Sequence, residues 1–586
     1  MTSVSGGLLP AAPTRLGRMR SAGNRVRSAG PFSVVSVVLG LLVAGTIAAV
    51  MARLGLMAWE RFGIGVFAFY WDQVLANPPI RQVVINTVVV VALACTLATF
   101  VAAILAWLSE RTDAGIGATG RFLPLIPFLM PGLAFPLGWL FLTAPNVGAL
   151  NVLIRGLLER VGVNLETGPI DLFTWPALVF LYTVPLIAYA YLVISSAMRN
   201  LDPGLEEAAK MAGANPPRIL LRIVLPALRP AMISAFLISM IPALAMLSIP
   251  LVVGYGADIT VVSVYILRRI TDSFPVGYAE AFLVGLLLVV PIMVVWWIQR
   301  RSAATGRLAV IGGRASAASR LRLGRRWRLV GRAVFVTYGL FGVGLPLFGL
   351  IYVAGSPRWT ATWPQSWDPI AVALNTLNEP RILGAFWNSL TLGIISASVL
   401  IVIAQLLTFS QQGHPRLGRF VDALAKSPAA IANILLAIGV LLTLGGPPFR
   451  FSPGVLLVIA YIICYIPYAS VVTTAAQQQV GKELIEAAKL SGASDFRMLG
   501  RIVTPLTRNA LLAGLILVFV LISGDINVAL ILASGPSPVI GSAMWEIFEF
   551  GGFVSVANFA LVVTLVSTTA ILTMALLASR SGLPRR

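Results

Sequence analysis

Residues that could carry out chemistry are sparse in this chain of 586 residues, and they form no reactive set. The single histidine, His414, excludes a histidine-based metal cluster. Cys95 and Cys464 both lie inside apolar runs, which argues against a disulfide framework and against a cysteine metal site. No Ser/His/Asp set and no paired carboxylates accompany them. The residues therefore predict that the chain is not an enzyme and holds no metal or cofactor of its own.

The sequence pattern also lacks a nucleotide-binding site. No segment fits G-x-x-x-x-G-K-[ST], the loop that cradles the phosphates of ATP. Gly481-Lys482 is followed by Glu483 and lacks the upstream glycine. If ATP drives the activity of this chain, a separate subunit must therefore bind it.

One carboxylate, Asp525, lies deep inside an apolar stretch. Ionisable groups within membrane segments often mark the path of a substrate or an ion. Asp525 is therefore a candidate to line or gate a passage. The alternative is a cap, at the point where Gly524 interrupts the helix. One such group, without a counterpart in the first half of the chain, gives poor support for a proton relay.

The strongest pattern is a direct repeat. Residues 207–231 read EAAKMAGANPPRILLRIVLPALRPA, and residues 486–510 read EAAKLSGASDFRMLGRIVTPLTRNA. The two segments align without a gap, and 14 of the 25 positions are identical. The chain is therefore predicted to consist of two related halves.

Each copy predicts a short helix, a glycine turn and a second helix. Asp202 and Pro203 suit the start of the first helix, and Asn215 is expected to cap the second. Ser494 or Asp495 takes that role in the second copy. Acidic residues in the first turn are favoured by the helix dipole, and the glycine after each helix suits a C′ position.

Such a loop is suited to docking against a partner. Its alanines let another surface approach closely, its glutamates offer charge to an arginine, and its capped helix forms a rigid lever. The candidate docking residues are Glu207, Ala208, Ala209, Gly213, Glu486, Ala487, Ala488 and Gly492.

The composition places the rest of the chain in a membrane. Hydrophobic residues make up 58% and charged residues 11%, whereas soluble domains have about 25% charged residues. These values exclude an ordinary soluble domain and also disorder. The net charge of +21 would suit nucleic acid, but basic loops between apolar spans explain it better. We therefore expect membrane lipid, and no nucleic acid, as a partner.

Twelve stretches are long enough and apolar enough to cross a bilayer as helices. They are 33–55, 82–108, 121–143, 176–198, 232–254, 278–298, 329–355, 388–408, 425–444, 454–476, 511–532 and 553–577. If the N-terminus lies in the cytoplasm, the cytoplasmic loops hold most of the 43 Lys and Arg residues, as the positive-inside rule requires. Both termini are then cytoplasmic.

The expected fold is all-α and polytopic, with two parallel repeats of six transmembrane helices. Smaller matches between the halves are Asn86-Thr87 with Asn388-Ser389, and Pro185 with Pro467. The expected segments are a basic cytoplasmic N-terminus (1–32), a first half (33–298, core domain 82–298), an Arg-rich cytoplasmic linker (299–328), a second half (329–577, core domain 384–577) and a cytoplasmic tail (578–586).

The segments EAAKMAG…RIVLP and EAAKLSG…RIVTP resemble the EAA loop of ABC importer permeases. These are the binding-protein-dependent transport permeases of the type I, MetI-like fold. The resemblance covers most of the chain. The second copy departs from the pattern at Thr504, where leucine is usual, and at Asn509, where the first copy has Pro230. Fusion of two permease domains in one chain resembles the ferric-iron permeases.

The resemblance implies that each EAA loop forms a coupling helix in a groove of an ATP-binding subunit. Two copies of that subunit would bind the ATP, and a periplasmic or lipid-anchored solute-binding protein would deliver the solute. It also implies a location in the bacterial inner membrane. The expected solute is ferric iron, with thiamine, phosphonate or polyamine as alternatives. An ion-coupled secondary transporter is the alternative mechanism.

Overall fold

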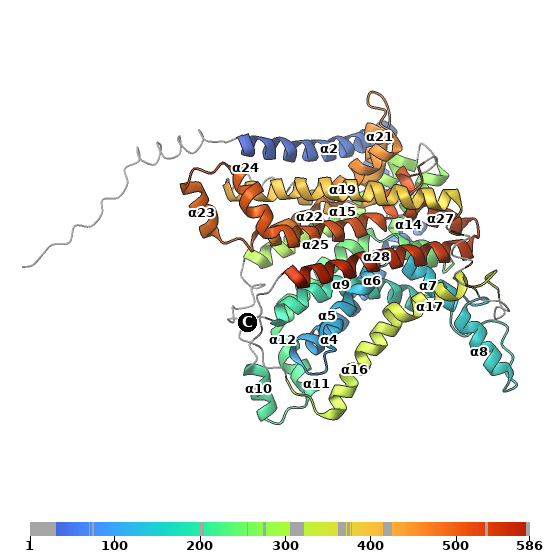
Figure 1. Cartoon of the computed structure of the whole chain (residues 1–586). Helices are drawn as coiled ribbons and strands as arrows, with labels where there is room; N and C mark the ends of the chain where they lie inside the picture. Colours follow the sequence, from blue (N-terminus) through green and yellow to red (C-terminus); the bar gives the residue numbers. More distant parts are fainter. Residues whose placement is uncertain are drawn as a thin grey trace, which may run out of the picture.

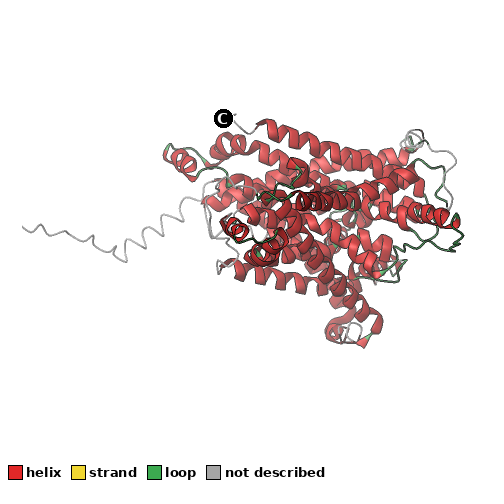
Figure 2. Cartoon of the chain, turned by 90° about the horizontal axis from the view of Figure 1, so that it is seen from below, coloured by secondary structure: helices red, strands yellow, loops and turns green. Residues whose placement is uncertain are grey.

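The computed structural model describes residues 31–69, 76–199, 204–254, 256–273, 277–304, 321–360, 378–413, 425–533 and 537–581, with a few single positions between these ranges. The predicted cap residues Asp202 and Pro203, His414 and most of the basic N-terminus lie outside them. Within the described ranges the chain folds into an elongated bundle of helices (Figures 1 and 2). Within these ranges, Thr112 and Leu321 form an isolated parallel β-bridge.

The first half contains fourteen α-helices in the described ranges, with four short 3-10 or π turns between them. They are α2 (Pro31–Phe62), η1 (Gly63–Gly65), α3 (Val66–Phe69), α4 (Pro78–Arg111), α5 (Gly117–Phe122), η3 (Leu123–Leu125), α6 (Ile126–Leu129), α7 (Ala134–Thr143), α8 (Ala149–Glu159), α9 (Trp175–Arg199), α10 (Gly204–Met211), α11 (Pro216–Ile219), η4 (Leu220–Val224), α12 (Leu225–Ala227), α13 (Arg229–Ala245), η5 (Pro250–Gly254), α14 (Val262–Asp272) and α15 (Gly277–Ala304).

The described helices of the second half follow a similar order. They are α16 (Arg325–Gly339), η6 (Leu340–Gly344), α17 (Leu345–Ala354), α19 (Pro380–Gly413), η7 (Ser427–Ala430), α21 (Asn433–Leu444), α22 (Pro453–Gln477), α23 (Lys482–Leu490), α24 (Asp495–Met498), η8 (Leu499–Val503), α25 (Thr504–Ser523), α26 (Asn527–Leu532), α27 (Ile540–Glu549) and α28 (Phe553–Ser581).

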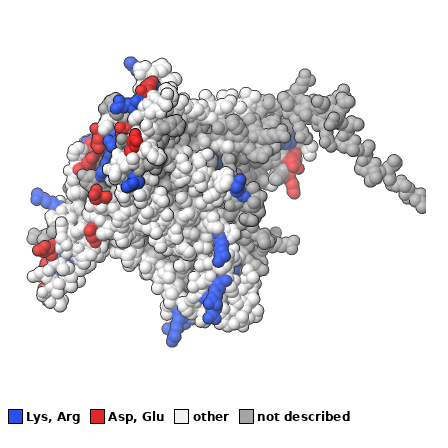
Figure 3. Space-filling view, turned by 180° about the vertical axis from the view of Figure 1, so that it is seen from behind, with Lys and Arg blue, Asp and Glu red and all other residues white. Residues whose placement is uncertain are grey.

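The apolar helices account for all twelve predicted spans. Eight helices among the described residues are long and apolar enough to cross a membrane, and the pair α11–α12 with α13, bent by 74°, makes a ninth. Three shorter apolar helices, α7, α21 and the first part of α28, coincide with the remaining predictions. Uncharged side chains cover the middle of the molecule, and charged ones gather toward its edges (Figure 3). The prediction of a polytopic all-α protein is confirmed.

Four predicted spans are not continuous helices. In 425–444, the extended residues Ile431 and Ala432 separate η7 from α21. In 121–143, prolines that include Pro124 and Pro127 remove backbone donors, and the segment divides into α5, η3, α6 and α7. The stretch 232–254 leaves the α-helix at Met246, whose backbone is extended (ψ 125°). The stretch 511–532 breaks at Gly524 between α25 and α26. Apolar composition alone did not reveal these breaks.

Each half packs its first helix on the other half. Helix α2 lies on α19 and α21, and α17 lies on α7. The crossing of α7 and α17 depends on two glycines. A Cβ atom on Gly138 would lie 2.3 Å from the Pro346 carbonyl oxygen, and one on Gly349 would lie 2.1 Å from the Gly138 carbonyl oxygen. The backbones of the two halves therefore touch at this point.

We predict that Gly349→Ala destabilises the protein by about 1–3 kcal/mol, because its methyl group overlaps the α7 backbone. The measurement is the unfolding temperature of the purified protein in detergent. Gly384→Ala is the matched control, since this helical glycine has open space around it. The control should be neutral or slightly stabilising, because alanine favours a helix. Equal unfolding temperatures for the two variants would contradict the close crossing.

Candidate functional site

The two repeated segments form matching structures at one end of the bundle. We call residues 204–219 the first EAA loop and residues 482–498 the second EAA loop. Each consists of a short helix (α10 or α23), a glycine turn and a second short helix (α11 or α24), and each continues into a π turn (η4 or η8). Helices α9 and α22, of 25 residues each, lead into them. The repeat in the sequence is therefore a repeat in three dimensions.

The glycine turns have the predicted conformation. Gly213 has φ +78° and Gly492 has φ +77°, a region that residues with a Cβ atom rarely adopt. The Gly213 amide donates to the Lys210 carbonyl, and the Gly492 amide donates to the Lys489 carbonyl, both at 3.0 Å. Both glycines therefore occupy C′ positions that end α10 and α23.

The predicted caps of the second short helices differ between the loops. The Ser494 hydroxyl accepts from the Arg497 amide at 3.4 Å, so Ser494 rather than Asp495 caps α24. Asn215 occupies the corresponding position before α11, but its side chain makes no capping hydrogen bond. The predicted N-cap position of Asn215 is confirmed, but not a side-chain hydrogen bond. Pro216 and Pro217 explain why that bond matters little, because prolines at the helix start lack the amide donors that a cap would satisfy.

The predicted docking residues lie mostly on the surface of these loops. The side chains of Glu207, Ala208, Glu486 and Ala487 are exposed, Ala209 is half-buried and Ala488 is buried. Sequence reasoning missed the apolar residues beside them. Met211 is 84% exposed and Leu490, at the same place in the repeat, is 90% exposed; Leu205 and Leu484 form a second exposed pair. Large apolar side chains repeated on an exposed surface indicate an interface.

The first EAA loop is fixed to the bundle by a buried ion pair that the sequence did not reveal. The Arg111 Nε atom lies 3.0 Å from Glu206 Oε1, and the two side chains are only 1% and 3% exposed. Arg111 also donates to the Leu201 carbonyl at 3.2 Å. Burial raises the pKa of the Glu206 carboxyl, and the charge of Arg111 opposes that rise. The end of α4 and the start of α10 are thereby held together.

The second EAA loop is held by apolar packing instead. Ile485 takes the place of Glu206 in the repeat, and it is buried with Phe409 and Val480. Helix α19 has the same 34-residue length as α4, so Gly413 takes the place of Arg111. The two loops have the same order of helices and turns, but different contacts hold them on the bundle.

The connection between the halves lies against the first EAA loop. The Leu321 amide donates to the Arg111 carbonyl at 2.8 Å, and the Asp113 amide donates back to the Leu321 carbonyl at 3.3 Å. Asp113 also pairs with Arg328 at 3.1 Å. Lys210 of α10 donates to the Arg322 carbonyl at 3.0 Å. Hydrogen bonds and an ion pair therefore join the described end of the Arg-rich linker to the end of the first half that carries the first EAA loop.

At the opposite end of the bundle, the smaller sequence matches have equivalent partners. The Asn86 side chain donates to the Thr260 carbonyl at 3.1 Å, and that of Asn388 donates to the Pro538 carbonyl at 3.0 Å. The Thr87 and Ser389 hydroxyls each accept from the first amide of the following short helix, α14 or α27. These residues hold one amphipathic helix per half across the start of α4 or α19.

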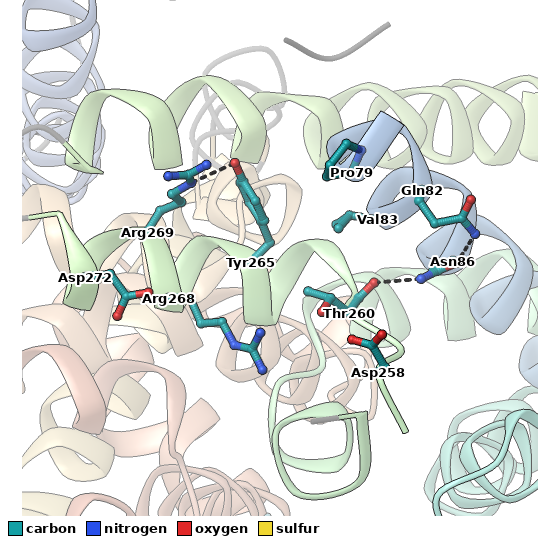
Figure 4. Close-up of a pocket in the computed structure, with 10 residues that line it drawn as sticks. All are labelled: Pro79, Gln82, Val83, Asn86, Asp258, Thr260, Tyr265, Arg268, Arg269 and Asp272. Atoms are coloured by element: carbon teal, nitrogen blue, oxygen red, sulfur yellow. Dashed lines mark hydrogen bonds between the residues drawn. The ribbon is translucent and has the colours of Figure 1, made fainter. Parts of the chain in front are cut away.

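Beside these contacts the halves again differ. In the second half, Arg381 of α19 pairs with Glu546 of α27. The corresponding residues of the first half are Pro79 and Arg268, and they line an open pocket of about 450 Å³ (Figure 4). Arg269 extends beside it and donates to the Tyr265 hydroxyl at 2.8 Å. This pocket presents charges of both signs at the end opposite the EAA loops.

Asp525 is buried where the two halves meet. Its carboxylate accepts from the Tyr465 hydroxyl and from the Val528 amide, each at 2.8 Å. The second contact is a cap on α26, directly after the break at Gly524. The Gly132 amide of the first half donates to the Gly524 carbonyl at 3.3 Å. The geometry of a cap is thus present, and a role of Asp525 in a passage stays a prediction.

Among the described residues, no group of three or more His, Cys, Asp or Glu side chains could hold a metal ion. The fold is that of a duplicated membrane protein with two matched EAA loops at one end of the bundle.

The chain belongs to the family of binding-protein-dependent transport system inner membrane components, whose model matches residues 99–304 and 317–582. The resemblance drawn from the EAA segments is therefore confirmed, as is the fusion of two such domains in one chain.

Three curated relatives show the range of the family. The chain is 26% identical over 398 residues to "Probable ABC transporter permease protein y4fN" of Sinorhizobium fredii, covering 65% of this chain and 66% of the relative. It is 24% identical over 375 residues to "Putative ferric transport system permease protein FbpB 1" of Haemophilus influenzae (60% and 56%). It is 26% identical over 235 residues to "Putrescine transport system permease protein PotI" of Escherichia coli (40% and 77%). The chain thus spans between about half and two thirds of the length of the first two relatives.

The ion pair of the first EAA loop gives a testable prediction. Arg111→Met leaves the Glu206 carboxylate buried without its partner, which should cost about 3–5 kcal/mol. The double variant Arg111→Met/Glu206→Leu imitates the apolar seat of the second loop and should recover most of that loss. The measurement is the unfolding temperature together with the rate of proteolysis within the first EAA loop.

Arg199→Met is the matched control, because Arg199 is exposed and its buried partner Glu110 retains a second ion pair, with Arg121 at 3.1 Å. Its loss should cost no more than about 1 kcal/mol. A control variant as unstable as Arg111→Met would contradict a special role for the buried pair.

Proposed function

We propose that this chain forms the complete membrane passage of an ATP-driven importer. The observation that carries the proposal is the pair of EAA loops, which have the same backbone plan, the same exposed Glu-Ala surface and the same exposed apolar pair. Two ATPase subunits would bind there, one on each loop. With this end in the cytoplasm, the basic linker faces the cytoplasm as well. The membrane would then be the inner membrane of a bacterium, with both termini in the cytoplasm.

The mechanism is alternating access. The ATPase subunits close on ATP and draw the two EAA loops together. Because each docking helix ends at a rigid glycine turn, and α10 is bonded to α4 through Glu206 and Arg111, the movement reaches the spanning helices. The halves then rock about their contact near Gly132 and Gly524. A solute-binding protein delivers its solute at the opposite end, where the open pocket beside Arg268 and Arg269 offers polar contacts.

Ferric iron is the proposed solute. Similarity to a putative ferric transport system permease of Haemophilus influenzae supports it. Similarity to a putrescine transport permease makes a polyamine the second candidate. Thiamine and phosphonate are further candidates, because the fusion of two permease domains also resembles permeases for those solutes. An ion-coupled carrier has less support, because Asp525, the carboxylate deep in a predicted span, is engaged by Tyr465 and Val528.

We predict that Gly213→Val and Gly492→Val each reduce ATPase binding and solute uptake. A side chain at this φ costs about 1–2 kcal/mol and displaces the end of the docking helix. The measurements are the nucleotide-hydrolysing activity that co-purifies with the tagged chain from its own membranes, and uptake by the cells. Gly481→Val is the control, since Gly481 lies beside α23 with an ordinary φ of −58° and open space. Unchanged co-purification and uptake in both glycine variants would contradict docking.

The energy source and the solute are tested separately. Cells that lack this chain should lose uptake of radioactive ferric iron while they retain uptake of putrescine. Uptake should stop when ATP is depleted and should persist when an uncoupler is added with ATP held constant. Loss of putrescine uptake instead would select the polyamine alternative. Transport into vesicles by the purified chain without any ATPase would refute the ATP-driven mechanism.

A further inference from the structure

A groove of about 920 Å³ runs along the outside of the bundle between α4, α9 and α16. Leu93, Leu97 and Leu105 form one wall, Phe180 lies on α9, and Val330 and Phe341 lie on the α16 side. All three helices belong to membrane-spanning segments, so the groove faces the interior of the bilayer. Any occupant must therefore be as apolar as a lipid chain along this length.

Most of the lining is apolar, and two of its polar groups are engaged within the protein. The Tyr338 hydroxyl donates to the Pro124 carbonyl at 3.2 Å, and the Thr183 hydroxyl donates to the Val179 carbonyl at 2.7 Å. The walls thus present apolar surface. This surface suits a hydrocarbon chain better than a polar solute.

In the other half of the molecule, the helix that corresponds to α16 packs closely on its neighbours. Helix α2 opens the first half as α16 opens the second, and it lies along α19 and α21. Its residues Val43, Ile47 and Val50 are buried in the core of the second half. On the α16 side, Val330 remains 51% exposed and Phe341 42% exposed. Beside α16, the groove against α4 and α9 is open.

Basic and amphipathic side chains stand at one end of this groove. Arg326 and Trp327 lie one helical turn before Val330, toward the EAA loops, and they continue the face of α16 that lines the groove. Both side chains are exposed, and Arg326 forms none of the ion pairs recorded between described residues. The sequence has no acidic residue between 299 and 367. Arginine beside tryptophan at the end of a span is typical of the head-group level of a membrane.

We propose that this groove binds an anionic phospholipid from the leaflet on the side of the EAA loops. Its acyl chain lies between α4, α9 and α16, and its phosphate group lies against Arg326. The lipid fills the gap that is left between α16 and the neighbouring helices α4 and α9. A zwitterionic phospholipid with the same chains gains the groove contacts but carries no net charge for the arginine, so it binds less tightly.

Native mass spectrometry of the purified chain tests the proposal. After removal of lipid, phosphatidylglycerol or phosphatidylethanolamine with identical chains is added back, and the fraction of protein that carries one lipid is measured. We expect tighter binding of phosphatidylglycerol. Arg326→Gln should weaken that binding about fivefold, since one arginine near an anionic membrane surface contributes about that much. Arg332→Gln removes an equal charge from the opposite face of α16 and should leave binding unchanged.

A second pair of variants tests the groove independently of charge. Thr337→Trp places a large ring among the lining residues and should abolish binding of both lipids. Val336→Trp adds the same ring at the neighbouring exposed position, which does not line the groove, and should retain binding. Unfolding temperatures of the two variants establish that both are folded.

Two results would overturn the proposal. Equal binding of the two lipids would refute the anionic head-group site, and undiminished binding to a folded Thr337→Trp variant would refute the groove as its place. Because neither measurement involves transport or an ATPase subunit, both are independent of the proposed function.

Discussion

The absence of water in the bilayer core is the constraint on which this structure depends. Irregular backbone at that depth is tolerated only where protein or an internal cavity covers it, because unpaired amides and carbonyls are costly there. The interrupted spans obey this rule. At one break, the Gly524 carbonyl accepts a hydrogen bond from the Gly132 amide of the other half. At another, the Met246 carbonyl accepts one from the Ser263 hydroxyl at 2.7 Å. The break at Gly524 therefore lies at a contact between the two halves.

The halves are related but not interchangeable. Each presents an EAA loop with a glycine at the same positive φ, so the surfaces offered to a partner are alike. The contacts that hold the loops on the bundle differ. A buried arginine–glutamate pair holds the first loop, and an apolar cluster around Ile485 holds the second. The connection at Leu321 is bonded only to the docking end of the first half among the described contacts. Equal movements of two ATPase subunits would therefore meet different local resistance in the two halves.

Much of the candidate site followed from the sequence because it is local. The helix–glycine–helix plan of each EAA loop is encoded within 25 residues, and the cap at Ser494 lies beside the helix it begins. Residues distant in the chain escaped prediction. Arg111 and Glu206 are separated by 95 positions, and neither belongs to the repeated segment. The exposed pair Met211 and Leu490 could have been noticed, since large apolar side chains at matched positions of two short polar helices have no buried face to explain them.

The sequence by itself determined that this chain lies in a membrane, crosses it as helices and is built from two parallel halves with matched loops. Those features follow from apolar length, charge distribution and direct repetition, which need no knowledge of contacts. Only the tertiary structure decided where the helices break, which half each first helix covers and how each EAA loop is seated. These outcomes depend on close approaches such as Gly138 against Gly349, and on pairings between distant segments. Membrane helices are apolar on almost every face, so hydropathy alone cannot indicate which faces meet.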